Sequence, residues 1–74
     1  MQKYHLEFIL HIQDTPVDTI RNSISELGEL LEITDCQDNV AKGKNFKINI
    51  ETKDPTVIFD ACAQFGRIKS VKIK

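Results

Sequence analysis

The chain carries one pattern twice, and this repeat limits the folds that it can adopt. An alternating run of apolar residues leads into Asp14-Thr15-Pro16-Val17, and an amphipathic stretch then continues to Gly28. A second alternating run leads into Lys53-Asp54-Pro55-Thr56, and a second amphipathic stretch continues to Gly66. One further apolar run follows each stretch. Two strand–helix–strand units within 74 residues predict a small domain that mixes helix and sheet.

The first predicted strand covers residues 4–12 and has one apolar face. Alternate positions place on one side Tyr4, Leu6, Phe8, Leu10 and Ile12. The other side carries His5, Glu7, Ile9 and His11. A period of two with one apolar side is typical of a strand with one buried face. The same reasoning predicts strands over residues 30–35, 46–52 and 68–73, with a hairpin loop over residues 37–45.

Two helices are expected between these strands. Thr15 is the predicted N-cap of the first helix, and its apolar stripe comprises Val17, Ile20, Ile24 and Leu27. Asp54 is the predicted N-cap of the second, and its stripe comprises Ile58, Ala61, Cys62 and Phe65. Gly28 and Gly66 are expected to end the helices in the left-handed conformation.

The resulting order of elements predicts an α+β ferredoxin-like βαββαβ sandwich. Right-handed crossovers place both helices on one side of the sheet. The four strands are expected to form an antiparallel sheet in the spatial order 4-1-3-2, with both helices on one face. We expect one domain over residues 1–74, with the other sheet face open to solvent or to a partner.

Composition excludes several classes of partner. Ten basic and eleven acidic side chains give a formal charge of −1, whereas proteins that hold nucleic acid usually carry a basic excess. The outward positions of the two central strands carry no Phe or Tyr that could stack on bases. No apolar run is long enough to cross a membrane. We therefore expect no nucleic-acid partner and no membrane contact, and a cytoplasmic protein whose Cys36 and Cys62 are free thiols.

No residue set in the chain has the spacing of a reactive site. His5 and His11 share a sheet face, but about 20 Å of strand separates them, so they cannot hold one metal ion. Cys36 could meet a histidine only if the register of the sheet allowed it. The three glycines stand apart from one another and form no phosphate-binding loop. We therefore expect no catalytic residue, no metal and no cofactor, and hence no enzyme.

Phe59 is the unusual residue of the second predicted helix, because it lies at the edge of the apolar stripe. With Asp60, Ala63 and Gln64 it would form a partly exposed apolar patch that has a polar rim. The alternative is that Phe59 folds against the edge of the sheet as peripheral core.

Three segments of the chain resemble the middle domain of the chemotaxis histidine kinase CheA. They are Ile24-Ser25-Glu26-Leu27-Gly28-Glu29-Leu30, residues 46–55, and the helix over residues 58–65. The resemblance implies a non-catalytic protein-binding module that docks a CheY-like response regulator in two-component signalling. It also implies a domain excised from a longer chain. Carried over residue by residue, the docking surface would comprise Phe59, Asp60, Ala63 and Arg67.

A second resemblance is to ACT-like regulatory modules, which share the βαββαβ order. Gln13-Asp14-Thr15-Pro16-Val17 resembles the ligand-binding turn of that family, although Val17 stands where the family usually has glycine. This alternative implies a small ligand, an amino acid, bound at Asp14, Thr15 and Val17. It also implies a dimer that forms through the sheet.

Overall fold

The computed structural model describes residues 2–36 and 43–74 and contains four strands and two helices in the predicted order. The first half comprises β1 (Tyr4–Ile12), α1 (Val17–Ile24) and β2 (Glu29–Asp35). The second half comprises β3 (Lys44–Thr52), α2 (Pro55–Ala63) and β4 (Arg67–Ile73). Residues 37–42 of the predicted hairpin loop lie outside the described residues.

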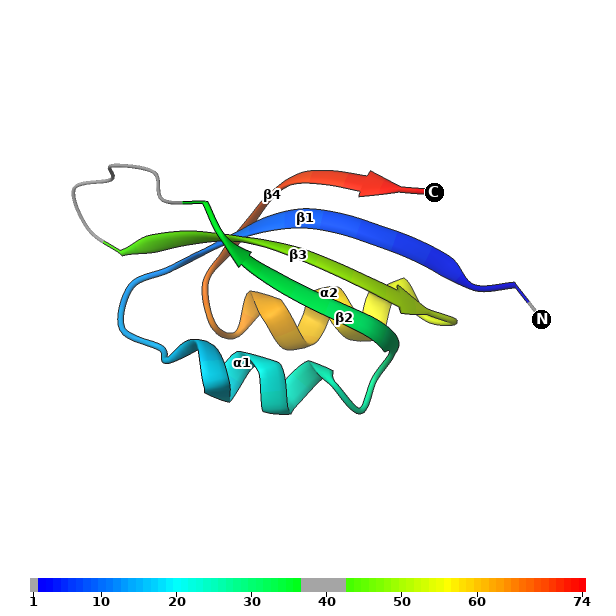
Figure 1. The fold of residues 1–74 in the computed structure, drawn as a ribbon, viewed down its shortest axis with the longest axis horizontal. Coiled ribbons are helices and arrows are strands. Elements are labelled where there is room, and N and C mark those ends of the chain that lie inside the picture. The colour runs from blue at the N-terminus through cyan, green and yellow to red at the C-terminus, as the bar shows by residue number, and fades with distance from the viewer. Residues whose placement is uncertain (1, 37–42) are drawn as a thin grey trace.

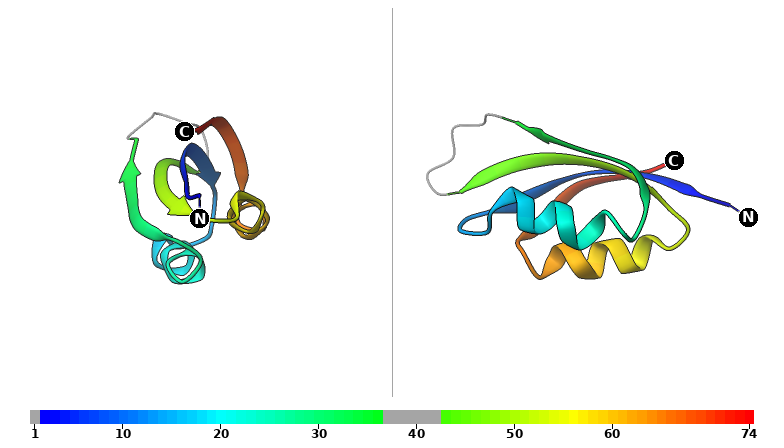
Figure 2. Two further views of the ribbon diagram at one scale, coloured as in Figure 1. Left: turned by 90° about the vertical axis from the view of Figure 1, so that its right-hand side faces the viewer. Right: turned by 60° about the horizontal axis from the view of Figure 1, so that its bottom comes forward.

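The strands form one antiparallel sheet in the order β2-β3-β1-β4, with both helices on the same face (Figure 1). The two further views show the same two layers (Figure 2). Read from its other edge, this order is 4-1-3-2, so the predicted ferredoxin-like sandwich is confirmed.

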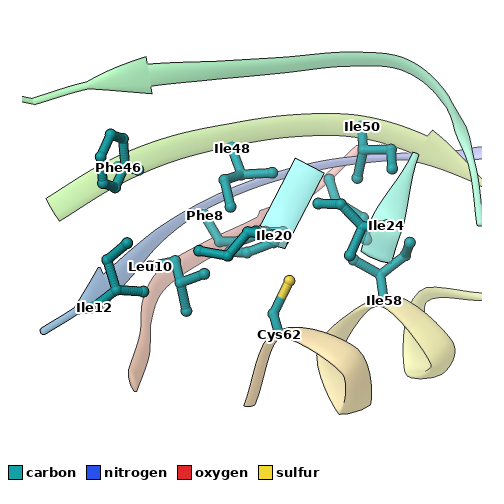
Figure 3. Close-up of a cluster of buried hydrophobic side chains, with 11 residues drawn as sticks. Phe8, Leu10, Ile12, Ile20, Ile24, Phe46, Ile48, Ile50, Ile58 and Cys62 are labelled. Atoms are coloured by element: carbon teal, nitrogen blue, oxygen red, sulfur yellow. The ribbon is translucent and has the colours of Figure 1, made fainter. Parts of the chain in front are cut away.

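The core lies between the inward face of the central strands and the two helices (Figure 3). Alternate residues of β1 are buried, as the period of two predicted. They meet Ile48 and Ile50 from β3, which pair with Phe8 and Leu6 across the ladder. The helices close this layer with Ile20, Ile24, Ile58 and Cys62. Tyr4, which was also predicted to face inward, is exposed at the start of β1.

The first helix begins and ends differently from the prediction. Its N-cap is Pro16 rather than Thr15, and no side chain caps it. The helix ends at Ile24, so Leu27 falls outside it and is exposed instead of completing the buried stripe. The second helix begins as predicted, because the Asp54 carboxylate accepts a hydrogen bond from the Thr56 amide (3.1 Å).

Gly28 and Gly66 are required for close packing rather than for a left-handed turn. Of the described glycines only Gly43 has a positive φ. A Cβ atom on Gly28 would lie 2.5 Å from the Glu51 carbonyl oxygen, and one on Gly66 would overlap the His11 carbonyl oxygen. The prediction of left-handed stops at these two positions was therefore wrong.

Both edge strands are irregular. The pairing of β2 with β3 shifts between Glu29 and Glu32, and Leu30 lies in this shift with φ 55°. The pairing of β4 with β1 shifts opposite Phe8, and Ser70 lies there with φ 57°. Bulged edges pair poorly with a further strand, so the sheet is protected against growth at either side.

The two ends of the described chain lie side by side. His5 and Lys74 exchange backbone hydrogen bonds of 3.0 and 2.9 Å. Both ends lie where α1 finishes and α2 begins (Figure 1). None of the helices in the described ranges is long and apolar enough to cross a membrane.

Ile48 tests the predicted central position of β3. Ile48→Ala removes a fully buried side chain, so we expect the free energy of unfolding to fall by about 2–5 kcal/mol. Ile73→Ala is the control, because Ile73 is 52% exposed and its truncation should cost less than about 1 kcal/mol. Urea unfolding monitored by circular dichroism measures both. Equal losses at the two positions would contradict the assignment of the core.

Cys62 gives the fold a dependence on alkaline pH. Burial raises the pKa of its thiol from 9.0 to about 11. The unfolded chain therefore ionises first, so stability is unaffected below about pH 9 and is lost as the pH rises toward about 11.

Across this window we expect the free energy of unfolding to fall by about 2 kcal/mol through Cys62 alone. Denaturant unfolding at a series of pH values measures it. The Cys62→Ala variant is the control, and its profile should lack this component. An identical alkaline fall in both proteins would show that Cys62 is not its source.

Candidate functional site

Hydrogen-bonded polar pairs occupy the outward face of the two central strands. His11 Nδ1 donates to Asn45 Oδ1 (2.8 Å), and Asn45 is only 4% exposed. His5 Nε2 donates to Asn49 Oδ1 (3.2 Å). These residues face one another across the β1–β3 ladder, where His11 pairs with Asn45. Their side chains serve one another, which leaves the imidazoles held rather than free to accept a ligand.

Glu7 adds an ionic contact to the same face. Its carboxylate lies 3.9 Å from Lys47 Nζ on β3 and 3.7 Å from Lys72 Nζ on β4. A carboxylate that lies between two ammonium groups ties together three strands. The outward face is therefore a network of paired charges and amides, and it supplies no group that is poised for chemistry.

The register keeps Cys36 away from the nearest histidine. The Cys36 amide donates to the Asn45 carbonyl (3.0 Å), and Asn45 pairs with His11 on its other side. Cys36 and His11 thus lie two strand spacings apart, about 10 Å. This distance excludes a direct thiol–imidazole pair. In the described ranges no three side chains of His, Cys, Asp or Glu come together as metal ligands.

Phe59 packs into the core and does not form the exposed patch. Its ring meets the ring of Phe8 edge to face, with 5.5 Å between centroids. It is half-buried against the core cluster. Asp60 and Ala63 are exposed on α2, whereas Arg67 lies beyond the helix, at the start of β4. The structure therefore separates Arg67 from the other three residues predicted for docking.

Arg67 instead lies beside two residues predicted for ligand binding. With Asp14 and Thr15 it lines a hollow of about 470 Å³, whose wall includes the half-buried Phe65. Val17 lines a separate hollow of about 350 Å³ together with Lys44 and Phe46, so the third predicted ligand residue is not in the first hollow.

Large apolar side chains are exposed mainly at the end of the molecule where the two chain ends lie. They are Tyr4, Leu27, Leu30, Val57 and Ile73, and Val71 follows further along β4. Register and contacts place them there: Tyr4 pairs with Thr52, and Ile73 with Leu6. We call this region the terminal surface. Scattered exposed apolar residues are normal, but their gathering at one end is typical of a contact site.

A hollow of about 290 Å³ is part of this surface. It lies between the α1–β2 turn and the β3–α2 turn, with Leu27 and Val57 in its lining, and we call it the terminal hollow. Hydrogen bonds hold its frame. The Thr52 hydroxyl donates to the Leu27 carbonyl (3.1 Å) and accepts from the Asp54 amide (3.1 Å). The absence of a Cβ on Gly28 lets the two turns approach.

The rim of the terminal hollow is charged. Lys3 Nζ lies 2.7 Å from a carboxylate oxygen of Glu29. This contact raises the pKa of Lys3 and lowers the pKa of Glu29. Both groups are well exposed, so the pair adds little to stability. Its effect is on the shape and charge of the rim.

Leu30 is the residue of this surface that sequence reasoning missed most clearly. It is 71% exposed and holds the left-handed conformation, which costs a residue with a Cβ about 1–2 kcal/mol. A strained apolar side chain directed to water points to a role in contact. One signal was available: Leu30 and Leu31 are adjacent apolar residues in a strand pattern, and such a break in the period of two indicates a bulge.

Comparison with known proteins identifies the family. No curated protein and no solved structure matches the chain. The family model for the FakA-like middle domain, which belongs to the fatty acid kinases, matches residues 1–74.

This match overturns both resemblances drawn from the sequence, to the CheA middle domain and to ACT-like modules, and with them the assignment to chemotaxis and two-component signalling. The physical reason is that the quoted segments encode the fold. Gly28 permits the contact with Glu51, and Ile48 and Ile58 fill the core, as a similar sandwich would require in any family. The chain belongs to the FakA-like middle-domain family of the fatty acid kinases.

Proposed function

We propose that this chain is a non-catalytic protein-contact domain within a FakA-like protein. The single observation that carries the proposal is the terminal surface, where exposed apolar side chains gather beside both chain ends. Apolar area that is exposed at one place and held on a hydrogen-bonded frame favours association with another protein.

Membership of the family supports the same interpretation. The family is a middle domain, and the protein that contains it is one subunit of a kinase. A domain of that kind has neighbours in its chain and at least one further subunit in its assembly. In our proposal the terminal surface meets one of these, and the chemistry of the kinase belongs to other parts of the protein.

The charges of the terminal hollow argue against a role in holding a fatty acid or a phosphate. Four carboxylates line it, on Glu26, Glu29, Glu51 and Asp54, against the two ammonium groups of Lys3 and Lys53. An anionic head group would meet net repulsion there. We therefore assign this hollow to protein contact.

Site-specific photo-crosslinking tests the proposal. A benzoylphenylalanine placed at position 30 or 73 should, on irradiation of cells that express the protein, join it to a kinase subunit or to another part of its own polypeptide. Mass spectrometry identifies the product. Position 32 on the outward face of β2 is the control, because Glu32 is exposed but lies outside the terminal surface.

We expect products at positions 30 and 73 at several times the yield of position 32. Equal yields at the three positions would remove the assignment of the surface. Products that contain no sequence from a kinase subunit would remove the assignment of the partner.

A second function is supported by the hollow at the opposite end of the sheet. Asp14 and Arg67 carry opposite charges, line the same 470 Å³ space and form no ion pair with each other. Their charges are therefore available to a small zwitterion such as an amino acid, with the carboxylate on Arg67 and the ammonium on Asp14. Phe65 offers an apolar wall for its side chain.

Titration with each of the twenty amino acids, followed by amide NMR, tests this second function. We expect at least one to shift the amides of Asp14 and Thr15, and Arg67→Gln to weaken it about tenfold. Lys69→Gln, on the same strand, is the control and should leave the affinity within about twofold. The absence of any shift with all twenty would dispose of the idea.

A further inference from the structure

We infer that the terminal hollow receives an apolar side chain that basic residues flank in the partner protein. This inference rests on the proposed function, since it names the chemistry of the partner at the same surface. Rigidity, size and charge are the three properties of the hollow that lead to it.

The hollow is preformed. Its apolar residues stand on ordered backbone: the Leu27 carbonyl is fixed by Thr52, and the Leu27 amide donates to the Ile24 carbonyl (3.0 Å). Val57 lies in the first turn of α2, whose start is capped by Asp54. Because the frame is ordered before binding, a partner side chain loses little free energy in organising it.

The size of the hollow suits a side chain. A space of about 290 Å³ lies at the small end of the range for small-molecule sites, which runs from about 300 to 1,000 Å³. Apolar anchors in compact, preformed pockets contribute much of the affinity of protein interfaces. Leu27 and Val57 together provide the apolar contact for one such anchor.

The charge of the rim selects what surrounds the anchor. Four acidic and two basic side chains give the lining a net charge of 4 × (−1) + 2 × (+1) = −2. The Lys3–Glu29 pair neutralises itself, and Asp54 is engaged by the Thr56 amide. Glu26, by contrast, is exposed and has no ionic partner among the described residues. Lys or Arg beside the anchor would complement this rim, whereas acidic neighbours would be repelled.

Two matched peptides test the inference with the full 74-residue chain. The basic probe is the acetylated amide Gly-Arg-Leu-Phe-Arg-Gly, and the acidic probe has glutamate in place of both arginines. Amide NMR titration measures where each binds and how tightly. We expect the basic probe to shift Leu27, Gly28 and Val57 and to bind about tenfold tighter than the acidic probe at low salt.

Two variants with the same change of net charge separate local from general electrostatics. Glu26→Lys should weaken the basic probe by about threefold to tenfold, because a cation then stands on the rim. Glu32→Lys, on the outward face of β2, should change it by less than about twofold. Unchanged dispersion of the amide spectra shows that both variants fold.

Equal binding of the two peptides, shifts confined to other surfaces, or no binding of either up to millimolar concentration would overturn the inference. So would equal losses in the two variants. None of these results touches the crosslinks from positions 30 and 73, which depend on the terminal surface as a whole. The chemistry of the partner and the existence of the contact can therefore fail separately.

Discussion

The pairing of β1 with its two neighbours is the interaction on which the rest of the structure depends. β1 lies in the interior of the sheet and is hydrogen-bonded to β3 on one side and to β4 on the other. Its inward residues, Leu6, Phe8, Leu10 and Ile12, are all buried. Because Phe8 also receives the ring of Phe59 from α2, one strand links both neighbouring strands and a helix. The opposite side of the same strand carries His5, Glu7 and His11 and thereby sets the polar network of the outward face.

Sequence periodicity was sufficient for the fold and insufficient for the site. The order of the strands follows from a period of two at β1 and β3 and from the handedness of the crossovers, and these are local or general constraints. The Asp54 cap was also legible, since an aspartate followed by proline has a defined role at a helix start. The end of α1 was not legible. Leu27 has the spacing of a core residue, but the approach of Gly28 to Glu51 terminates the helix first, and that contact joins residues distant in sequence.

The same limit explains the residues that were nominated for function. Phe59 was placed at the boundary between core and surface, and only the position of Phe8 on β1 decides that it packs inward. Asp14, Thr15 and Arg67 belong to different segments, and their meeting in one hollow depends on how two loops close over the edge of the sheet. The terminal surface depends on four separate segments that meet where the chain ends lie. Resemblance to other families was misleading because the matching residues serve the sandwich itself.

The adjacency of the chain ends has a mechanical consequence. The start of β1 and the end of β4 are neighbouring antiparallel strands, joined last by the bonds between His5 and Lys74. A pull that separates the two ends loads this outermost pair first and then each following pair in turn. Bonds that are loaded one after another resist far less than bonds that are loaded together in shear. Tension applied through its two ends would therefore peel β4 away from Lys74 toward the bulge at Ser70, so that under load the domain would yield as an extensible element of its protein.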